Sequence, residues 1–169
     1  KDKYLRRNGM TQYSKWFKQL QDDIVATVES LDSPMEERIA PTRNGWTQSH
    51  KTIKSTVFEK GTVNFSEVTG EFDPKFAKEI PGTEEHNEYY ATGTSVILHP
   101  MNPWVPAMHF NTRYLKTSTK EWFGGGMDVT PCIANDAYKA NYHTDLKTMC
   151  NEYDTSYYNK FSKACDEYF

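Results

Sequence analysis

Three polar side chains between Ala107 and Leu115 have the chemistry needed to bind an anion and to move a proton. His109, Asn111 and Arg113 alternate with a methionine, a phenylalanine, a threonine and a tyrosine, which is typical of a strand with one polar face. Imidazole exchanges protons near neutral pH, and a guanidinium forms paired hydrogen bonds with a carboxylate. From this strand alone, an ordinary exposed face with an incidental histidine is an equal alternative.

A second segment, Trp122–Pro131, places three glycines before a single carboxylate, Asp128. Each glycine costs about 0.5–1 kcal/mol relative to alanine inside a regular element, so we expect a large group to lie close to this backbone. A bulge or bend of the strand is the alternative. Taken alone, an aspartate before Thr130-Pro131 is more often a turn or cap residue than a catalytic group.

The spacing along the first strand favours a wide ligand. Alternate strand residues are about 7 Å apart, so His109 and Arg113 would be separated by roughly 13 Å. That distance suits different substituents of one large polyanion. A neighbouring antiparallel strand would bring Ser95 or His99 beside this row, although the register is not readable from sequence.

Several separated motifs give the chain a family resemblance. It resembles oxygen-dependent coproporphyrinogen III oxidase, in its amino-terminal portion, over most of its length. The motifs are Val57–Lys60, Val63–Ser66, Ser95–Pro100, Asn102-Pro103, Val105-Pro106, His109–Tyr114, Trp122–Pro131, Ser156–Tyr158 and Cys165–Phe169. Their number and order make a chance match improbable, whereas a lone glycine triplet would be weak evidence.

The resemblance implies an enzyme of haem biosynthesis. Such enzymes oxidatively decarboxylate two propionate side chains of coproporphyrinogen III to vinyl groups, giving protoporphyrinogen IX, with O2 as oxidant and no required cofactor. It also implies a homodimer in the cytoplasm. It assigns substrate contacts to Ser95, Asn111 and Arg113, contact with the pyrrole N–H groups to Asp128, and proton donation to His109. The family continues past residue 169, so we expect this chain to be part of a longer single-domain protein, with doubtful activity alone.

Two other functions stay open from the residues. One is a non-enzymatic tetrapyrrole-binding fragment that uses the same polar face. The other is a metal-dependent hydrolase with His99, His109 and His143 as ligands of a divalent metal, although their spacing matches no local ligand motif. His50 and His86 lie in loop-like polar contexts, and we expect both at the surface.

Composition excludes several classes of function. The formal net charge is −3 over 169 residues, without a broad basic patch, which argues against a nucleic-acid partner. No apolar run approaches the ~20 residues of a membrane span. Cys132, Cys150 and Cys165 lack zinc-site spacing and are odd in number, so free thiols in a reducing compartment are the simplest interpretation.

Apolar spacing and turn residues predict an α+β fold, a broad antiparallel sheet flanked by helices. We expect residues 32–44 to be a loop and Lys60-Gly61 to form a hairpin turn. The expected helices begin at Ser14, Asp73-Pro74, Asn135-Asp136 and Thr155, and the expected strands are 51–59, 62–68, 92–99, 105–117 and 121–129.

Overall fold

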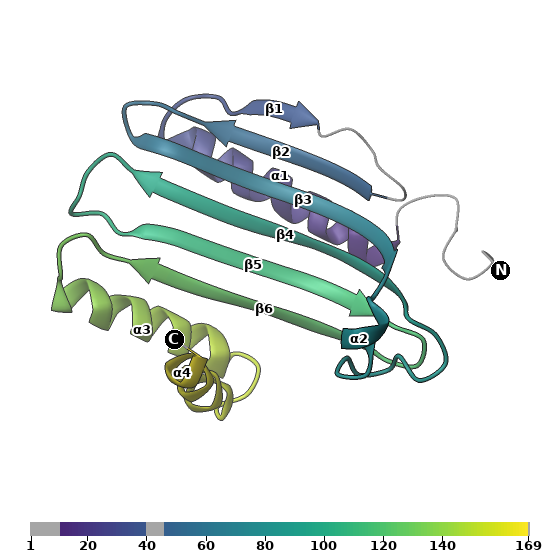
Figure 1. Cartoon of the computed structure of the whole chain (residues 1–169). Coiled ribbons are helices and arrows are strands. Elements are labelled where there is room, and N and C mark those ends of the chain that lie inside the picture. Colours follow the sequence, from purple (N-terminus) through teal and green to yellow (C-terminus); the bar gives the residue numbers. More distant parts are fainter. Residues whose placement is uncertain (1–10, 40–45, 169) are drawn as a thin grey trace. The chain divides into compact units, whose positions relative to one another are not determined.

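The computed structural model describes residues 11–39 and 46–168 (Figure 1). Contacts divide the chain into two compact units, Lys1–Cys132 and Ile133–Phe169, and each is described by itself. The first unit contains the sheet and the polar residues singled out from the sequence. The expectation of a single domain stays a prediction.

One six-stranded antiparallel sheet forms the first unit, with the strands side by side in chain order (Figure 1). This arrangement confirms the predicted α+β class. Residues 54–57, 101–106 and 117–120 are short connections, and a strand that follows a short connection pairs with the strand before it, whereas residues 72–87 form a longer connection. The strands are β1 (Glu36–Ile39), β2 (Trp46–Ile53), β3 (Phe58–Glu71), β4 (Glu88–Pro100), β5 (Ala107–Lys116) and β6 (Glu121–Thr130).

Helix α1 (Gln12–Leu31) packs on one face of this sheet, against β3 and β4. Its apolar residues recur three and four positions apart, so one stripe faces the sheet. The helix begins earlier than predicted. Thr11 is the N-cap and accepts a hydrogen bond from the backbone N–H of Ser14, whose own side chain is fully buried.

Two hydrophobic clusters fill the space between α1 and the sheet. Val28, Val63 and Leu98 belong to one cluster, and Phe17 and Phe65 belong to the other. The fully buried Gln21 side chain lies on the same side of the sheet. Its Nε2 atom donates to the carbonyl oxygens of Ser49 and Val63 at 2.9 Å, which connects the helix to β2 and β3.

A tyrosine ties the first turn of α1 to the sheet. The Tyr90 hydroxyl donates to Oε1 of Glu67 at 2.6 Å and lies 2.9 Å from Oγ1 of Thr11. Burial of the phenol, followed in size by its bond to Glu67, raises the pKa of Tyr90 to about 12. Burial and the bond to Glu121 also raise the pKa of Tyr114 on the same face. Both hydroxyls therefore stay protonated at neutral pH.

Two sequence predictions about the first hairpin were wrong. Residues 36–39 form strand β1 instead of loop, because they pair with β2 despite lacking an apolar pattern. The hairpin turn lies at residues 54–57, not at Lys60-Gly61. Gly61 lies inside β3, where a Cβ atom would be 2.8 Å from Leu98 and 2.9 Å from Ile53. Glycine at this position permits close packing of the neighbouring side chains on the sheet face that α1 covers, and it makes no turn.

The remaining predicted elements lie close to their expected positions. Asp73 caps the short helix α2 (Pro74–Ala77) by accepting from the N–H of Lys75, and residues 117–120 connect β5 to β6. Three strands, β4 to β6, begin within four residues of the predicted positions.

The second unit contains two helices, α3 (Asp136–Asn151) and α4 (Tyr157–Tyr168). Asn135 caps α3 as predicted, through its side-chain oxygen and the N–H of Tyr138. Before α4, Asp154 in place of Thr155 accepts from the N–H of Ser156. None of the helices in the described part of the chain is both long and apolar enough to cross a membrane.

Candidate functional site

The polar residues predicted from sequence share the sheet face opposite α1. Even-numbered residues of β4, such as Thr94 and Val96, are buried on the helix side, so Ser95 points to the other face. The register pairs Ser95 with Asn111 and Asn111 with Gly126, which places serine, asparagine and glycine in one row across three strands. We refer to this side of the sheet as the open face.

His109 and Asp128 form a hydrogen-bonded pair on the open face. They lie directly opposite each other on β5 and β6, with 2.9 Å between Nδ1 of His109 and Oδ1 of Asp128. The side chains are 39% and 37% exposed, so a ligand can reach both. A carboxylate can only accept, so the contact keeps a proton on Nδ1 and leaves Nε2 to exchange protons.

His99 lies next to this pair. Its Nε2 atom is 3.4 Å from Nε2 of His109, and the two rings are 5.6 Å apart between centroids. Two nitrogens at this distance share one proton between them, since a hydrogen bond needs one donor and one acceptor. The three side chains Asp128, His109 and His99 therefore form a connected path for a proton along the open face.

Arg113 presents its charge to the open face four residues along β5 from His109. Its Nη2 donates to Oδ1 of Asn111 at 3.2 Å, and its side chain is exposed. Within residues 11–39 and 46–168, no carboxylate forms an ion pair with Arg113. The guanidinium thus keeps most of its donors for an external anion.

The glycine triplet of β6 is divided between the two faces. A Cβ atom on Gly125 would lie 2.4 Å from the backbone oxygen of Asn111, so the fold requires glycine there. A Cβ on Gly124 or Gly126 would meet nothing within 4 Å. Packing in this structure therefore explains only the central glycine. The outer two leave flat, open backbone beside Arg113 and Asn111, with which they pair.

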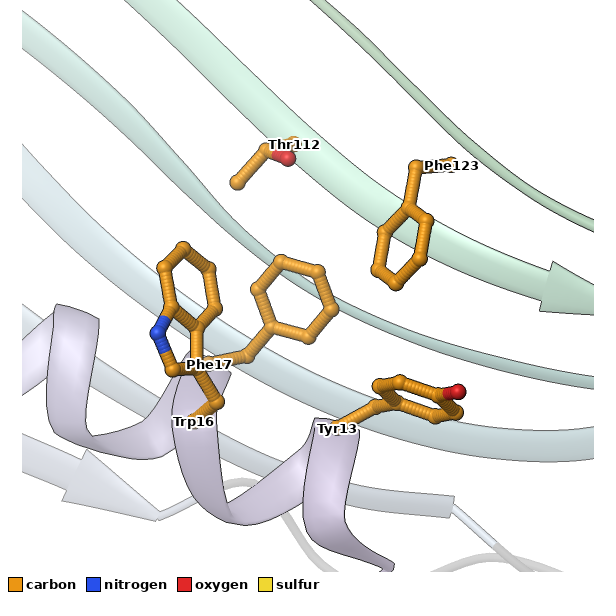
Figure 2. Close-up of a pocket in the computed structure, with 5 residues that line it drawn as sticks. All are labelled: Tyr13, Trp16, Phe17, Thr112 and Phe123. Atoms are coloured by element: carbon orange, nitrogen blue, oxygen red, sulfur yellow. The ribbon is translucent and has the colours of Figure 1, made fainter.

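An apolar pocket of the first unit lies on the other side of the sheet. Tyr13, Trp16 and Phe17 from α1 line it together with Thr112 of β5 and Phe123 of β6 (Figure 2). The rings of Tyr13 and Phe123 are 5.4 Å apart and edge-on. This apolar pocket contains none of the predicted site residues, because Thr112 points away from its neighbours Asn111 and Arg113.

A family model described as coproporphyrinogen III oxidase matches residues 12–169. The chain belongs to the coproporphyrinogen III oxidase family. Proteins named oxygen-dependent coproporphyrinogen-III oxidase from Rickettsia bellii (strain OSU 85-389) and Rickettsia rickettsii (strain Sheila Smith) are each 42% identical to it, over 167 and 171 residues. The homologue from Rickettsia africae (strain ESF-5) is 41% identical.

These matches confirm the family resemblance stated from the motifs. They cover 92% of this chain and 60% of each relative, so the chain spans about three fifths of the length of these coproporphyrinogen oxidases. The open face thus belongs to a member of this enzyme family, and the metal-dependent hydrolase is not favoured.

The three predicted metal-ligand candidates belong to two different units of the chain. His99 and His109 are neighbours, whereas His143 belongs to the second unit and lies 3.0 Å from the Tyr158 hydroxyl through its Nδ1 atom. Across the described residues, no group of three or more His, Cys, Asp or Glu side chains is arranged to hold a metal ion.

Sequence reasoning missed two residues of the open face, His50 and Asn64. His50 was expected in a surface loop, but it lies in β2, is only partly exposed, and has its Nδ1 atom 2.6 Å from Oδ1 of Asn64. His50 pairs with Asn64, and Asn64 pairs with Ser95. Alternation in residues 46–53 was the available signal, but the polar run from Thr47 to Lys51 lacks an apolar face that would indicate a strand.

Proposed function

We propose that the full-length protein converts coproporphyrinogen III to protoporphyrinogen IX by oxidative decarboxylation of two propionates. The observation that carries this proposal is the open face of a family member, where the His109–Asp128 pair, the exposed Arg113 and two open glycines lie together. Relatives at 42% identity carry the name of this oxygen-dependent enzyme. A wide, flat tetracarboxylate has the shape and charge that this surface fits.

Each decarboxylation balances with one O2. The bond to the carboxyl carbon breaks, and its electron pair forms the vinyl double bond as CO2 leaves. The propionate carbon next to the pyrrole ring loses a hydride, and the two electrons and the proton of that hydride, with one further proton, reduce O2 to H2O2. The reduced ring is electron-rich enough to react with O2, so the protein's contribution is to position the substrate and stabilise charge.

Each open-face residue has a proposed role. Arg113 binds a propionate carboxylate, with Asn111 and Ser95 donating hydrogen bonds nearby. Asp128 accepts from pyrrole N–H groups with the acceptor positions that His109 leaves free, since a carboxylate has about four of them. His109 exchanges a proton through Nε2, and the 2.9 Å contact with Asp128 supports this role by fixing the tautomer.

We further propose that the full-length protein is a cytoplasmic homodimer that needs no resident metal or organic cofactor and no nucleic-acid partner. Free Cys132, Cys150 and Cys165 support a reducing compartment. Activity that survives exhaustive chelation, together with a solution mass of twice the chain, is the expected result. Loss of activity that a divalent metal restores would contradict the cofactor proposal.

The deciding experiment supplies coproporphyrinogen III to the purified full-length protein and follows O2 uptake with CO2 release. We expect two CO2 per substrate and protoporphyrinogen IX as product. Binding of the tetrapyrrole without O2 uptake would instead identify a non-enzymatic binding protein. The variant R113Q tests whether the activity depends on the open face, because it should reduce both binding and turnover.

A further inference from the structure

We infer that His50 is a second carboxylate-binding residue of the open face, at the opposite side of the substrate from Arg113. The inference rests on the proposed function and extends the substrate surface to β2. It starts from the register, which aligns His50, Asn64, Ser95, Asn111 and Gly126 in one row across five strands.

Hydrogen bonds along this row have a defined direction. Nδ2 of Asn64 donates to Oγ1 of Thr62 at 3.3 Å and to Oγ of Ser95 at 3.4 Å, so Oδ1 is the acceptor of the same amide. Nδ1 of His50, 2.6 Å from that Oδ1, must therefore carry a proton. The Ser95 hydroxyl accepts from Asn64 and keeps its own hydrogen for donation to a ligand.

The second ring nitrogen of His50 is available. Nε2 has no hydrogen-bond partner among the residues that the structure describes. With Nδ1 held as a donor, protonation at Nε2 gives a cation whose free N–H projects from an oriented ring, which is the group that a carboxylate pairs with. Asn64 thus acts as a positioning residue for His50, as Asp128 does for His109.

The separation of His50 and Arg113 fits one wide polyanion. His50 lies three strands from Arg113 and two residues along the strand direction, which corresponds to roughly 16 Å at about 4.8 Å between strands and about 3.4 Å per residue. Two oxygens of one carboxylate cannot span that distance, whereas propionates on opposite sides of a tetrapyrrole can. Between these residues lie Ser95, Asn111 and the backbone of Gly93, where a Cβ would be 2.4 Å from the oxygen of Thr112.

The test measures binding of coproporphyrin III, the oxidised and unreactive form of the substrate, to the full-length protein by fluorescence titration. H50L should raise the Kd by about tenfold, which is the loss of affinity expected when a hydrogen bond to a charged group is removed. H50R should restore the Kd to within about threefold of wild type, because it returns a cation to the same position. H86L is the matched control, since His86 is an exposed histidine in the loop before β4, and it should leave the Kd unchanged.

Steady-state turnover and a second variant separate binding from structure. H50L should raise KM about as much as Kd and leave kcat within about twofold, since the lost contact is remote from the His109–Asp128 pair. N64A should raise the Kd less than H50L does. In the double variant H50L/N64A, the rise in Kd should be no larger than the H50L effect and the effect of losing the Asn64–Ser95 hydrogen bond taken together. Melting temperatures of all variants identify any that fail to fold, and H50R remains the decisive variant in that case.

Several outcomes would overturn the inference. A wild-type Kd for H50L, an H50R protein that binds no better than H50L, or an equal loss in H86L would each exclude His50 as a carboxylate ligand. Normal wild-type turnover with an unchanged KM in H50L would refute this inference alone. A wild-type protein that binds no coproporphyrin would overturn the proposed function as well.

Discussion

Nδ1 of His109 lies 2.9 Å from Oδ1 of Asp128 because strands β5 and β6 place the two residues directly opposite each other. The family resemblance assigned them separate roles: His109 donates a proton, and Asp128 contacts the pyrrole N–H groups. Their contact couples the two roles. The carboxylate determines which nitrogen of His109 carries the proton, and the imidazole occupies one of the carboxylate's acceptor positions.

Replacing His109 tests the proton-transfer role. H109Q keeps hydrogen-bonding capacity but removes the titration, so we expect kcat of the full-length enzyme to fall by roughly 10²–10⁴ and its pH dependence near neutrality to flatten. The Kd for coproporphyrin should change little. Single-turnover decarboxylation across pH is the measurement, with H86Q as control. A variant with the parent's rate and pH profile would reduce His109 to a binding contact.

Replacing Asp128 separates catalysis from stability. D128N presents an amide to His109 and no longer fixes its tautomer, and we expect turnover to fall by at least about 10². Both side chains are more than one-third exposed, so the pair contributes only about 0–1 kcal/mol to stability and the Tm should move by a few degrees at most. A large fall in Tm with full turnover in the folded fraction would instead identify Asp128 as a structural cap.

Replacing Arg113 tests the anion site. R113Q should weaken coproporphyrin binding by about 10- to 150-fold, the range for a charge-assisted hydrogen bond. Lys116, on the same strand but on α1's side of the sheet and 3.9 Å from Glu121, supplies the control K116Q, which should bind normally. Equal affinities of R113Q and wild type in a fluorescence titration would remove Arg113 from the site.

The glycine triplet predicts opposite effects for neighbouring alanine substitutions. G125A should lower the Tm by several degrees, because its Cβ would lie 2.4 Å from the oxygen of Asn111. G124A and G126A should leave Tm unchanged or slightly higher, but raise KM, since their methyl groups would project into the substrate surface. Thermal melts measure the Tm of the three variants, and steady-state kinetics measure their KM. Normal KM values for both outer variants would show that the substrate lies elsewhere.

Tyr90 predicts how stability depends on alkaline pH. Folding raises the pKa of Tyr90 from about 10 to about 12, so the folded state favours the protonated phenol. This contribution is complete below pH 10 and is lost as the pH rises through 12. Urea unfolding between pH 9 and 12 should show a steeper loss in wild type than in Y90F. The exposed Tyr153 provides the control Y153F, and identical slopes for Y90F and wild type would contradict the assignment.

Local sequence patterns were sufficient to predict most of the helices and strands and the residues that β5 contributes to the site. The three- and four-residue spacing of Phe17, Leu20 and Ile24 predicts α1, and alternation along residues 107–115 puts His109, Asn111 and Arg113 on one face. Both periods are properties of a short stretch of chain, so they can be read without knowing what packs against it. The family motifs are local for the same reason.

Tertiary structure alone decided which residues meet across strands. Ser95 lies opposite Asn111, Asp128 bonds His109, and His50 joins the row through Asn64, because the register of a strand pair depends on which side chains the opposite face buries in the core. The same packing places Gly61 inside β3 instead of in the predicted turn. A strand's period tells which side a residue occupies, but its neighbours come from contacts between segments far apart in sequence.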